Sequence, residues 1–191
     1  MHGRSSAEEY LQIAVETAPS THRCAAALDE LPVPIYVTDA DGVITYSNHA
    51  CAEFAGREPQ PGQDRWCVTW RLYTTSGELL PHDRYPMAEA IRERRAIRDS
   101  IAIAMRPDGS RVAFKAYPTP IHDENGDLLG AINMLIDISD EQADVLADQA
   151  ARCHRLARAT HDRECAVMLE TMAAEYEETA AALHSSGAGA K

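Results

Sequence analysis

The sequence predicts an α+β fold: a five-stranded antiparallel sheet with flanking helices, an additional N-terminal helix and a C-terminal helical hairpin. Three observations predict it. Two blocks of alternating apolar residues are separated by a stretch rich in proline and glycine, hairpin turns join strands within the blocks, and helical patterns occupy both ends of the chain. At 191 residues, the chain has room for one core of ordinary size plus accessory helices.

The composition argues against several classes of protein. Thirty acidic and eighteen basic residues give a formal net charge of -12, which repels nucleic acid and anionic lipid. No window approaches the ~20 apolar residues that a membrane span needs. The N-terminus lacks a secretory pattern, and the five cysteines are odd in number and form no CxxC pair. We therefore expect a cytoplasmic protein that binds neither nucleic acid nor a membrane.

Residues 1–31 are expected to form N-terminal helices. The first helix begins at two serines in a capping-box pattern and ends before Pro19, and the second covers residues 21–31. Two prolines, at positions 32 and 34, then impose extended chain.

A central domain is expected over residues 32–139. Strands are predicted over 34–39 and 43–47, joined by an Asp-Ala-Asp-Gly turn, and Asn48 can cap a helix over 49–55.

The second half of this domain begins with residues 56–86, where repeated proline and glycine predict loops and short turns. A helix is expected from Pro86 to Arg95. Three further strands are predicted over 99–105, 111–119 and 128–138, and their connecting Pro-Asp-Gly and Asp-Glu-Asn-Gly turns make them consecutive hairpins.

The tail is predicted to be a helical hairpin over residues 140–184, with a break at 160–162 and a disordered end over 185–191. Its apolar residues recur near heptad spacing. They are Leu169, Met172, Tyr176 and Leu183.

Four local strings, taken in order, resemble the PAS domain family: Thr38–Asn48, Arg106–Arg111, Pro120–Gly126 and Asp137–Ser139. They are similar to its opening hairpin, two later turns and exit motif, and the resemblance covers roughly residues 29 to 140. It implies that the concave face of the sheet and the helices enclose a pocket for a ligand or chromophore. It also implies that the signal leaves through the flanking helices, relayed by Asp137, Ser139 and Gln142.

The pocket of such a domain is expected to be lined by apolar and aromatic groups with one polar contact. The candidates are Phe54, Trp66, Trp70, Phe114, Asn133 and Leu135. A core that these residues simply fill is the alternative interpretation, and the sequence leaves both open.

The cofactor is left open, and the residues argue against flavin and haem. Cys67 lies eleven residues after Gly56, the spacing of the photoreactive cysteine in the flavin-binding LOV branch, but its surrounding string differs. The positions that match that branch's flavin-reading amides hold Ala104, Phe114 and Leu135, which cannot hydrogen-bond an isoalloxazine. Haem-binding members take a histidine from the long helix, which here has none, and His82 before it is interpreted as a turn residue.

The outer face of the predicted sheet carries six large apolar side chains that water cannot cover favourably. They are Ile101, Ile103, Met105, Ile132, Met134 and Ile136. Covering a few hundred Å² at ~25 cal/mol per Å² stabilises by several kcal/mol, so a second subunit should lie there and make a homodimer. Covering by the N-terminal helix, residues 6–18, is the alternative.

No catalytic or metal site is predicted. The chain has no Gly-x-Ser-x-Gly elbow, P-loop or HExxH string. Cys153, His154, His161 and Cys165 include zinc-compatible residues, but their spacing fits no familiar site. His161 faintly resembles a phosphoacceptor histidine and is interpreted as a helix-boundary residue.

The leading hypothesis is a sensory, signal-transducing module that binds a small ligand or partner and relays the change through its helices. The alternative is a ligand-free interaction adaptor or dimerisation module, whose helical tail docks a kinase or another regulator.

Overall fold

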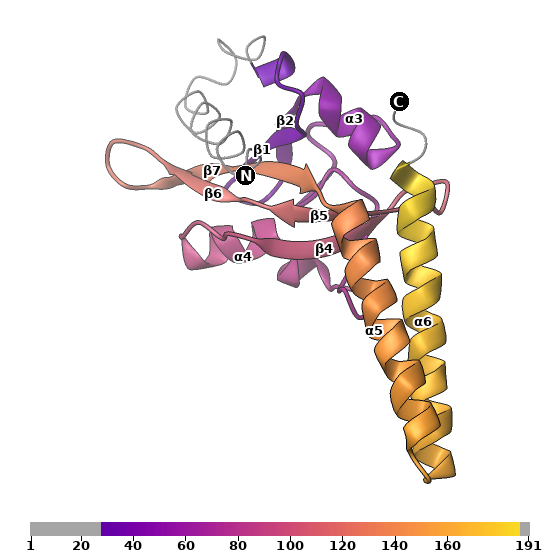
Figure 1. Ribbon diagram of the computed structural model, residues 1–191. Coiled ribbons are helices and arrows are strands. Elements are labelled where there is room, and N and C mark those ends of the chain that lie inside the picture. Colours follow the sequence, from indigo (N-terminus) through magenta and orange to yellow (C-terminus); the bar gives the residue numbers. More distant parts are fainter. Residues whose placement is uncertain (1–27, 188–191) are drawn as a thin grey trace, which may run out of the picture.

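The computed structural model describes residues 28–187. Seven strands form one antiparallel sheet in the order β2-β1-β7-β5-β4-β3, and β6 pairs with β7 beside this path (Figure 1). The strands are β1 (Ile35–Asp39), β2 (Ile44–Ser47), β3 (Arg71–Tyr73), β4 (Ser100–Met105), β5 (Arg111–Ala116), β6 (Thr119–His122) and β7 (Leu128–Asp137). The helices are α3 (His49–Ala55), α4 (Pro86–Glu93), α5 (Ser139–Ala159) and α6 (Arg163–Gly187), with a short 3-10 helix, η2 (His82–Arg84).

The predicted antiparallel sheet, its flanking helices and the C-terminal helical pair are confirmed, and the strand count is wrong by two. One additional strand, β3, forms in the stretch that was expected to hold only loops and turns, where three residues pair with β4. The other arises because the predicted 111–119 strand is divided. Pro118 has no N–H to donate to a ladder, so pairing stops after Ala116 and resumes at Thr119.

Strand β7 is the centre of the sheet because three other strands pair with it. β1 lies along one edge, from Ile35 opposite Met134 to Asp39 opposite Gly130. β5 and β6 share the other edge, one after the other. At Gly130, where φ is 157°, an added Cβ would lie 1.9 Å from the carbonyl oxygen of Thr38. Only glycine therefore lets β1 approach β7 at this point.

Asn48 holds the expected N-cap position of α3, but its side chain makes no capping hydrogen bond. Its Oδ1 instead accepts from the N–H of Ile35 at 2.9 Å, and its Nδ2 donates to the carbonyls of Leu28 and Val33 at 3.0 and 2.9 Å. The proline-containing segment before β1 has backbone groups without strand partners, and buried groups of that kind require one. The amide of Asn48 therefore joins this segment to the sheet.

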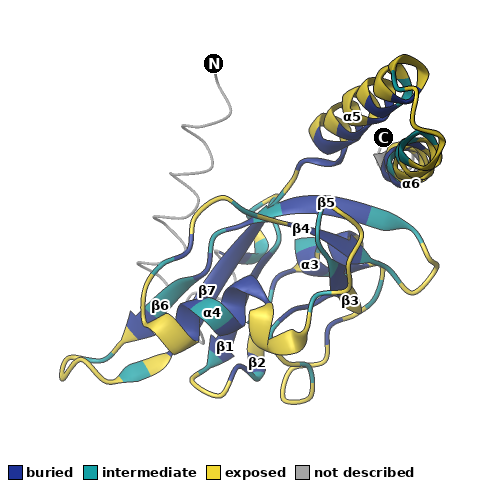
Figure 2. Cartoon of the chain, turned by 90° about the horizontal axis from the view of Figure 1, so that it is seen from below, coloured by how far each residue is buried: buried dark blue, intermediate teal, exposed yellow. Residues whose placement is uncertain are grey.

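The concave face of the sheet and the helices α3 and α4 enclose the main core. The opposite face contributes to two other clusters. Ile103 and Ala113 pack against Leu146 of α5 and Leu183 of α6, whereas Ile132 and Met134 pack with Leu28, Ile35, Val37 and Ile121. Figure 2 shows buried residues throughout the strands and mostly exposed ones along the helical pair.

The six outward-facing apolar residues therefore do not form one patch. The chain's own C-terminal helices cover Ile103, and Ile136 is partly buried against the same cluster. Ile101 is 38% exposed, and Met105 is half-buried. The other proposed cover, residues 6–18, lies outside the described residues.

The predicted N-terminal helices fall within residues 1–27, outside the described residues, apart from a single helical turn at Leu28 and Asp29. At the other end, α6 continues to Gly187, so residues 185–187 of the predicted disordered tail have a helical backbone. The break between α5 and α6 lies at the expected residues, 160–162. None of the helices among the described residues has both the length and the apolar character that crossing a bilayer requires.

Candidate functional site

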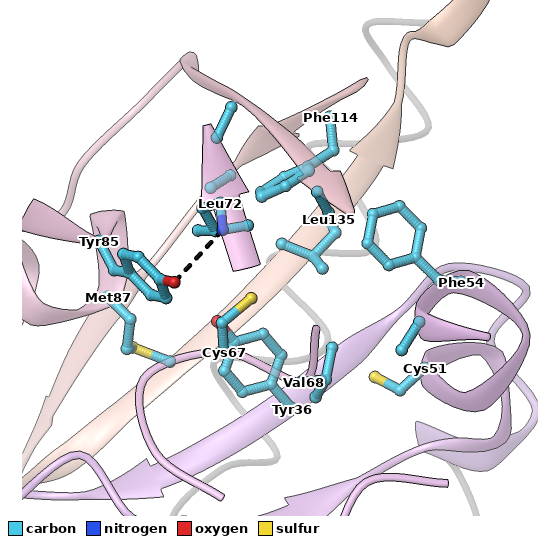
Figure 3. Close-up of a cluster of buried hydrophobic side chains, with 14 of the residues drawn as sticks. Tyr36, Cys51, Phe54, Cys67, Val68, Leu72, Tyr85, Met87, Phe114 and Leu135 are labelled. Carbon is cyan, nitrogen blue, oxygen red and sulfur yellow. Dashed lines mark hydrogen bonds between the residues drawn. The ribbon is translucent and has the colours of Figure 1, made fainter. Parts of the chain in front are cut away.

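The concave face holds most of the residues expected to line a pocket, and they pack directly against one another (Figure 3). Phe54 of α3 and Phe114 of β5 meet edge to face, with ring centroids 5.6 Å apart. Leu135 of β7 belongs to the same buried cluster. Trp66 is partly buried at its margin, whereas Trp70 is 55% exposed and lies at the surface. The structure thus brings three of these residues together in a filled core and leaves Trp70 outside it.

Asn133, the predicted polar contact, is buried on β7 and bonded to protein on both sides of its amide. Its Nδ2 donates to the hydroxyl of Tyr36 at 2.9 Å, and its Oδ1 accepts from the N–H of Tyr117 at 2.9 Å. The Tyr36 hydroxyl in turn donates to the carbonyl of Trp66 at 2.9 Å. Burial raises the pKa of Tyr36 well above its ordinary value, and this phenol is therefore neutral.

Two cysteine thiols lie in the same core. The Sγ of Cys67 is 3.1 Å from the Oγ1 of Thr69, and the Sγ of Cys51 donates to the carbonyl of Ile35 at 3.2 Å. Burial raises the pKa of both thiols above the ordinary value. Because the thiolate is the nucleophile, both cysteines are held in their unreactive form.

The junction between β7 and α5 is attached to β5 by hydrogen bonds of Ile138 and Ser139. The N–H of Ile138 donates to the carbonyl of Ala113 at 2.9 Å, and the Oγ of Ser139 accepts from the N–H of Ala113 at 3.1 Å. Asp137 accepts the N–H of Ser139 at 2.8 Å, and Gln142 is buried one turn into α5. The first turn of α5 is therefore attached to the sheet by hydrogen bonds.

A family model described as the PAS fold matches residues 28–143. The chain belongs to the PAS family. It is a sensory PAS module in the general sense of that family.

Several solved structures are similar to this PAS domain. An RNA-binding light-oxygen-voltage receptor is 20% identical, with a TM-score of 0.49, over 72% of this chain and 40% of the receptor. The PAS domain of the fruit-fly ELK potassium channel is 15% identical, with a TM-score of 0.47, over 61% of this chain and 95% of that one. The LOV domain of a blue-light activated histidine kinase from Erythrobacter litoralis is 18% identical, with a TM-score of 0.43, over 57% and 98%.

The chain spans less than half the length of that first receptor. No curated protein matches the chain.

The residues inside this PAS domain do not fit a flavin. Ala104, Phe114 and Leu135 are all buried in the core cluster and offer no side-chain hydrogen bond to an isoalloxazine. The buried amide nearby, on Asn133, is already bonded at both ends. Haem fits no better at His82, which is exposed on η2 with its ring 5.0 Å from that of Tyr85.

An open cleft of about 470 Å³ lies at the surface beside this core. Among its lining residues, only Trp70 was predicted as a pocket residue, because arginines in a loop give no periodic signal. The lining residues are Arg57, Gln63, Asp64, Arg65, Cys67, Thr69, Trp70 and His82.

Contacts within the protein hold the walls of this cleft. Arg57 pairs with Asp64 at 2.7 Å. Arg65 donates to the carbonyl of Asp41 at 2.6 Å and lies over the ring of Trp66, 5.5 Å from its centroid. Cys67 and Thr69 are buried residues in the lining, so the cleft adjoins the core. The two arginines can hydrogen-bond an anion, and the exposed indole of Trp70 can stack on a planar group.

The helices α5 and α6 pack along their length, side by side (Figure 1). Ala150 and Cys153 contact Ala173 in a small buried cluster away from the sheet. On one side of the pair, the two ring nitrogens of His154 lie 2.7 Å from Glu170 and 3.1 Å from Glu177. Within the described residues, no group of three metal-ligating side chains is positioned to hold a metal ion.

The polar bonds of Asn133 predict a coupled loss of stability. Replacing Asn133 by leucine leaves the Tyr36 hydroxyl short of one donor, and we expect a loss of about 1–3 kcal/mol in the free energy of unfolding. Tyr36→Phe should cost a similar amount, and the double variant less than the sum by at least ~0.5 kcal/mol, because both changes remove the same bond. Urea denaturation measures all three. Tyr73→Phe, whose hydroxyl contacts only the Sδ of Met105 at 3.9 Å, is the matched control. Strict additivity would contradict the coupling.

The bridge made by His154 predicts a pH dependence of the helical pair. The bonds from Glu177 and Glu170 raise the pKa of this imidazole above 6.5, so its contribution is fully present below pH 6.5 and is lost as the pH rises through the raised value. The thermal midpoint of His154→Gln should therefore fall below that of the unsubstituted chain at acidic pH, and the difference should shrink at alkaline pH. Thr171→Ala, which removes a hydroxyl that bonds within α6 and does not titrate, should show no such trend. A difference that grows with pH would refute this assignment.

Proposed function

We propose that the chain is a homodimeric signal-transducing PAS module that binds a small planar anion in the Arg57–Trp70 cleft and transmits its occupancy to the α5–α6 pair. The observation that carries the proposal is the hydrogen-bonded junction between β5 and α5 at Ala113 and Ser139. A movement of β5 at Ala113 would displace the first turn of α5, because these hydrogen bonds join the two. The proposal places the module in the cytoplasm and includes no catalytic step.

A set of hydrogen bonds connects the cleft to the end of β5, the strand that carries Ala113. Arg65 and Cys67 line the cleft on either side of Trp66, whose carbonyl accepts from Tyr36. Tyr36 bonds Asn133, which bonds Tyr117 at the break between β5 and β6. A ligand that moves the loop from Arg65 to Cys67 would thereby change the position of β5, to which α5 is bonded. Ligand binding would then shift the population of α5 orientations.

The relay is tested by releasing α5 from β5. Ser139→Ala removes the acceptor for the N–H of Ala113, and we expect faster hydrogen exchange at Ala113 and in the first turn of α5, with an unchanged rate in β1. Thr171→Ala is the control, since that hydroxyl bonds only within α6. Equal exchange in the variant and the parent chain would mean that Ser139 does not couple strand to helix.

The ligand is tested on the purified chain by an absorption spectrum and native mass spectrometry, followed by thermal shift with aromatic carboxylates and nucleotides. A ligand at one hundred times its Kd should raise the stability by about 2.7 kcal/mol. Arg57→Gln and Trp70→Ala should abolish that stabilisation. Leu79→Ala should keep it, because this exposed side chain lies outside the lining of the cleft. A ligand that protects all variants equally binds elsewhere.

The filled core favours a second candidate, the ligand-free adaptor. Phe54 and Phe114 are in direct contact, and the buried amide of Asn133 has protein partners. In an adaptor, the helical pair docks a kinase or another regulator, with no small molecule involved. A colourless chain without added mass, unaffected by every anion tested, would favour the adaptor over the ligand sensor.

A further inference from the structure

The exposed apolar side chains of the described residues gather on the helical pair. Nine large apolar side chains are exposed in the described part of the chain, and five of them lie on α5 or α6. Leu156 is 49% exposed and Met168 is 58% exposed. The five are Val145, Leu156, Val167, Met168 and Met172. Exposed apolar residues that are grouped in this way usually mark an interaction surface.

Four of these side chains lie on one side of the pair. On α5, Val145 directly precedes the buried Leu146, and Leu156 directly precedes the buried Ala157. On α6, Met168 precedes the partly buried Leu169, and Met172 precedes the buried Ala173. One position turns an α-helix by about 100°, so all four are rotated from the contact between the helices in the same sense. Because the helices are antiparallel, equal rotations bring them to the same side.

The bonds of His154 provide an independent check of this geometry. His154 follows the buried Cys153 by one position, and its partner Glu170 follows Leu169 by one position. Residues rotated in this opposite sense do meet, at 2.7 Å. The two sides of the pair are therefore distinct: one carries the His154 bridge, and the other carries the four apolar residues, which we call the apolar face.

The charges on the apolar face are self-complementary. By the same rule, Arg152 precedes Cys153 on α5, and Glu175 precedes Tyr176 on α6, so each lies on this face. Both side chains are exposed, and the ion pairs within the helical pair are those of His154. When α5 of one copy packs on α6 of a second copy, Arg152 of the first can form an ion pair with Glu175 of the second.

We propose that the apolar face is the contact between two copies of this chain, in which α5 of each copy packs on α6 of the other to form a four-helix bundle. The inference rests on the proposed homodimer and identifies its interface, and it does not depend on the relay. The apolar face takes the place of the outer sheet face, which the sequence predicted as the dimer contact. On that sheet face, α5 and α6 of the same chain already cover Ile103.

The size of the face suits a reversible dimer. α5 has 21 residues, and at 1.5 Å per residue and about 10 Å per helix diameter the face measures roughly 30 by 20 Å. Two copies would bury about 1,200 Å² in total, the lower end of the range for stable interfaces. We therefore expect a dimer that dissociates on dilution.

The decisive measurement is sedimentation velocity of the full chain over a range of concentrations. Leu156→Glu and Met168→Glu should each weaken dimerisation by about 100-fold, because each places an unpaired carboxylate in an apolar contact. Val167→Glu, on the same helix but two positions before Leu169, should leave it unchanged. Far-ultraviolet circular dichroism confirms that each variant keeps its helices.

A charge exchange tests the arrangement of the helices. Arg152→Glu and Glu175→Arg should each weaken the dimer, and the double variant should restore it, which a folding defect would not do. A monomer at every concentration would overturn both this interface and the proposed homodimer. A dimer that Leu156→Glu leaves intact but Ile101→Glu dissociates would overturn this interface alone and place the contact on the sheet. Hydrogen exchange in the Ser139→Ala variant tests the relay independently of the dimer.

Discussion

The position of Asn133 on β7 is the constraint on which the rest of the structure depends. A single amide joins β1, through Tyr36, to the point where β5 ends and β6 begins, through Tyr117. β7 pairs with all three of these strands. A buried amide without partners would cost free energy, so the strands on both edges are held in the one register that satisfies it.

This arrangement has a consequence for function. Asn133 and Tyr36, the polar groups in this core, hydrogen-bond protein atoms of the sheet and its connections. Large apolar side chains pack around Phe114. A surface cleft adjoins this core at the buried residues Cys67 and Thr69. In the proposed function, a change at the cleft would reach β5 through the same hydrogen bonds that hold the strands together.

The outer face of the sheet carries the helical tail. β7 delivers the chain onto this side, and Ile138 and Ser139 bond β5 before α5 has completed its first turn. The end of α6 returns to the same surface, where Leu183 is fully buried. Both helices therefore have one end on the sheet, and the remainder of the pair extends away from it (Figure 1). In the proposed relay, movement of the sheet would therefore move the exposed surface of this helical pair.

The sequence by itself determined the turns and most of the order of elements, because periodicity and turn chemistry are local properties. Tertiary structure decided the rest. Strand β3 forms because β4 offers it an edge, and Asn48 bonds the chain before β1 because that backbone lacks other partners. Residues distant in sequence decide whether Trp70 lies in the core or beside a cleft. They also decide which face of α5 stays exposed to solvent. Burial and hydrogen-bond completion are properties of the assembled chain, and no local pattern records them.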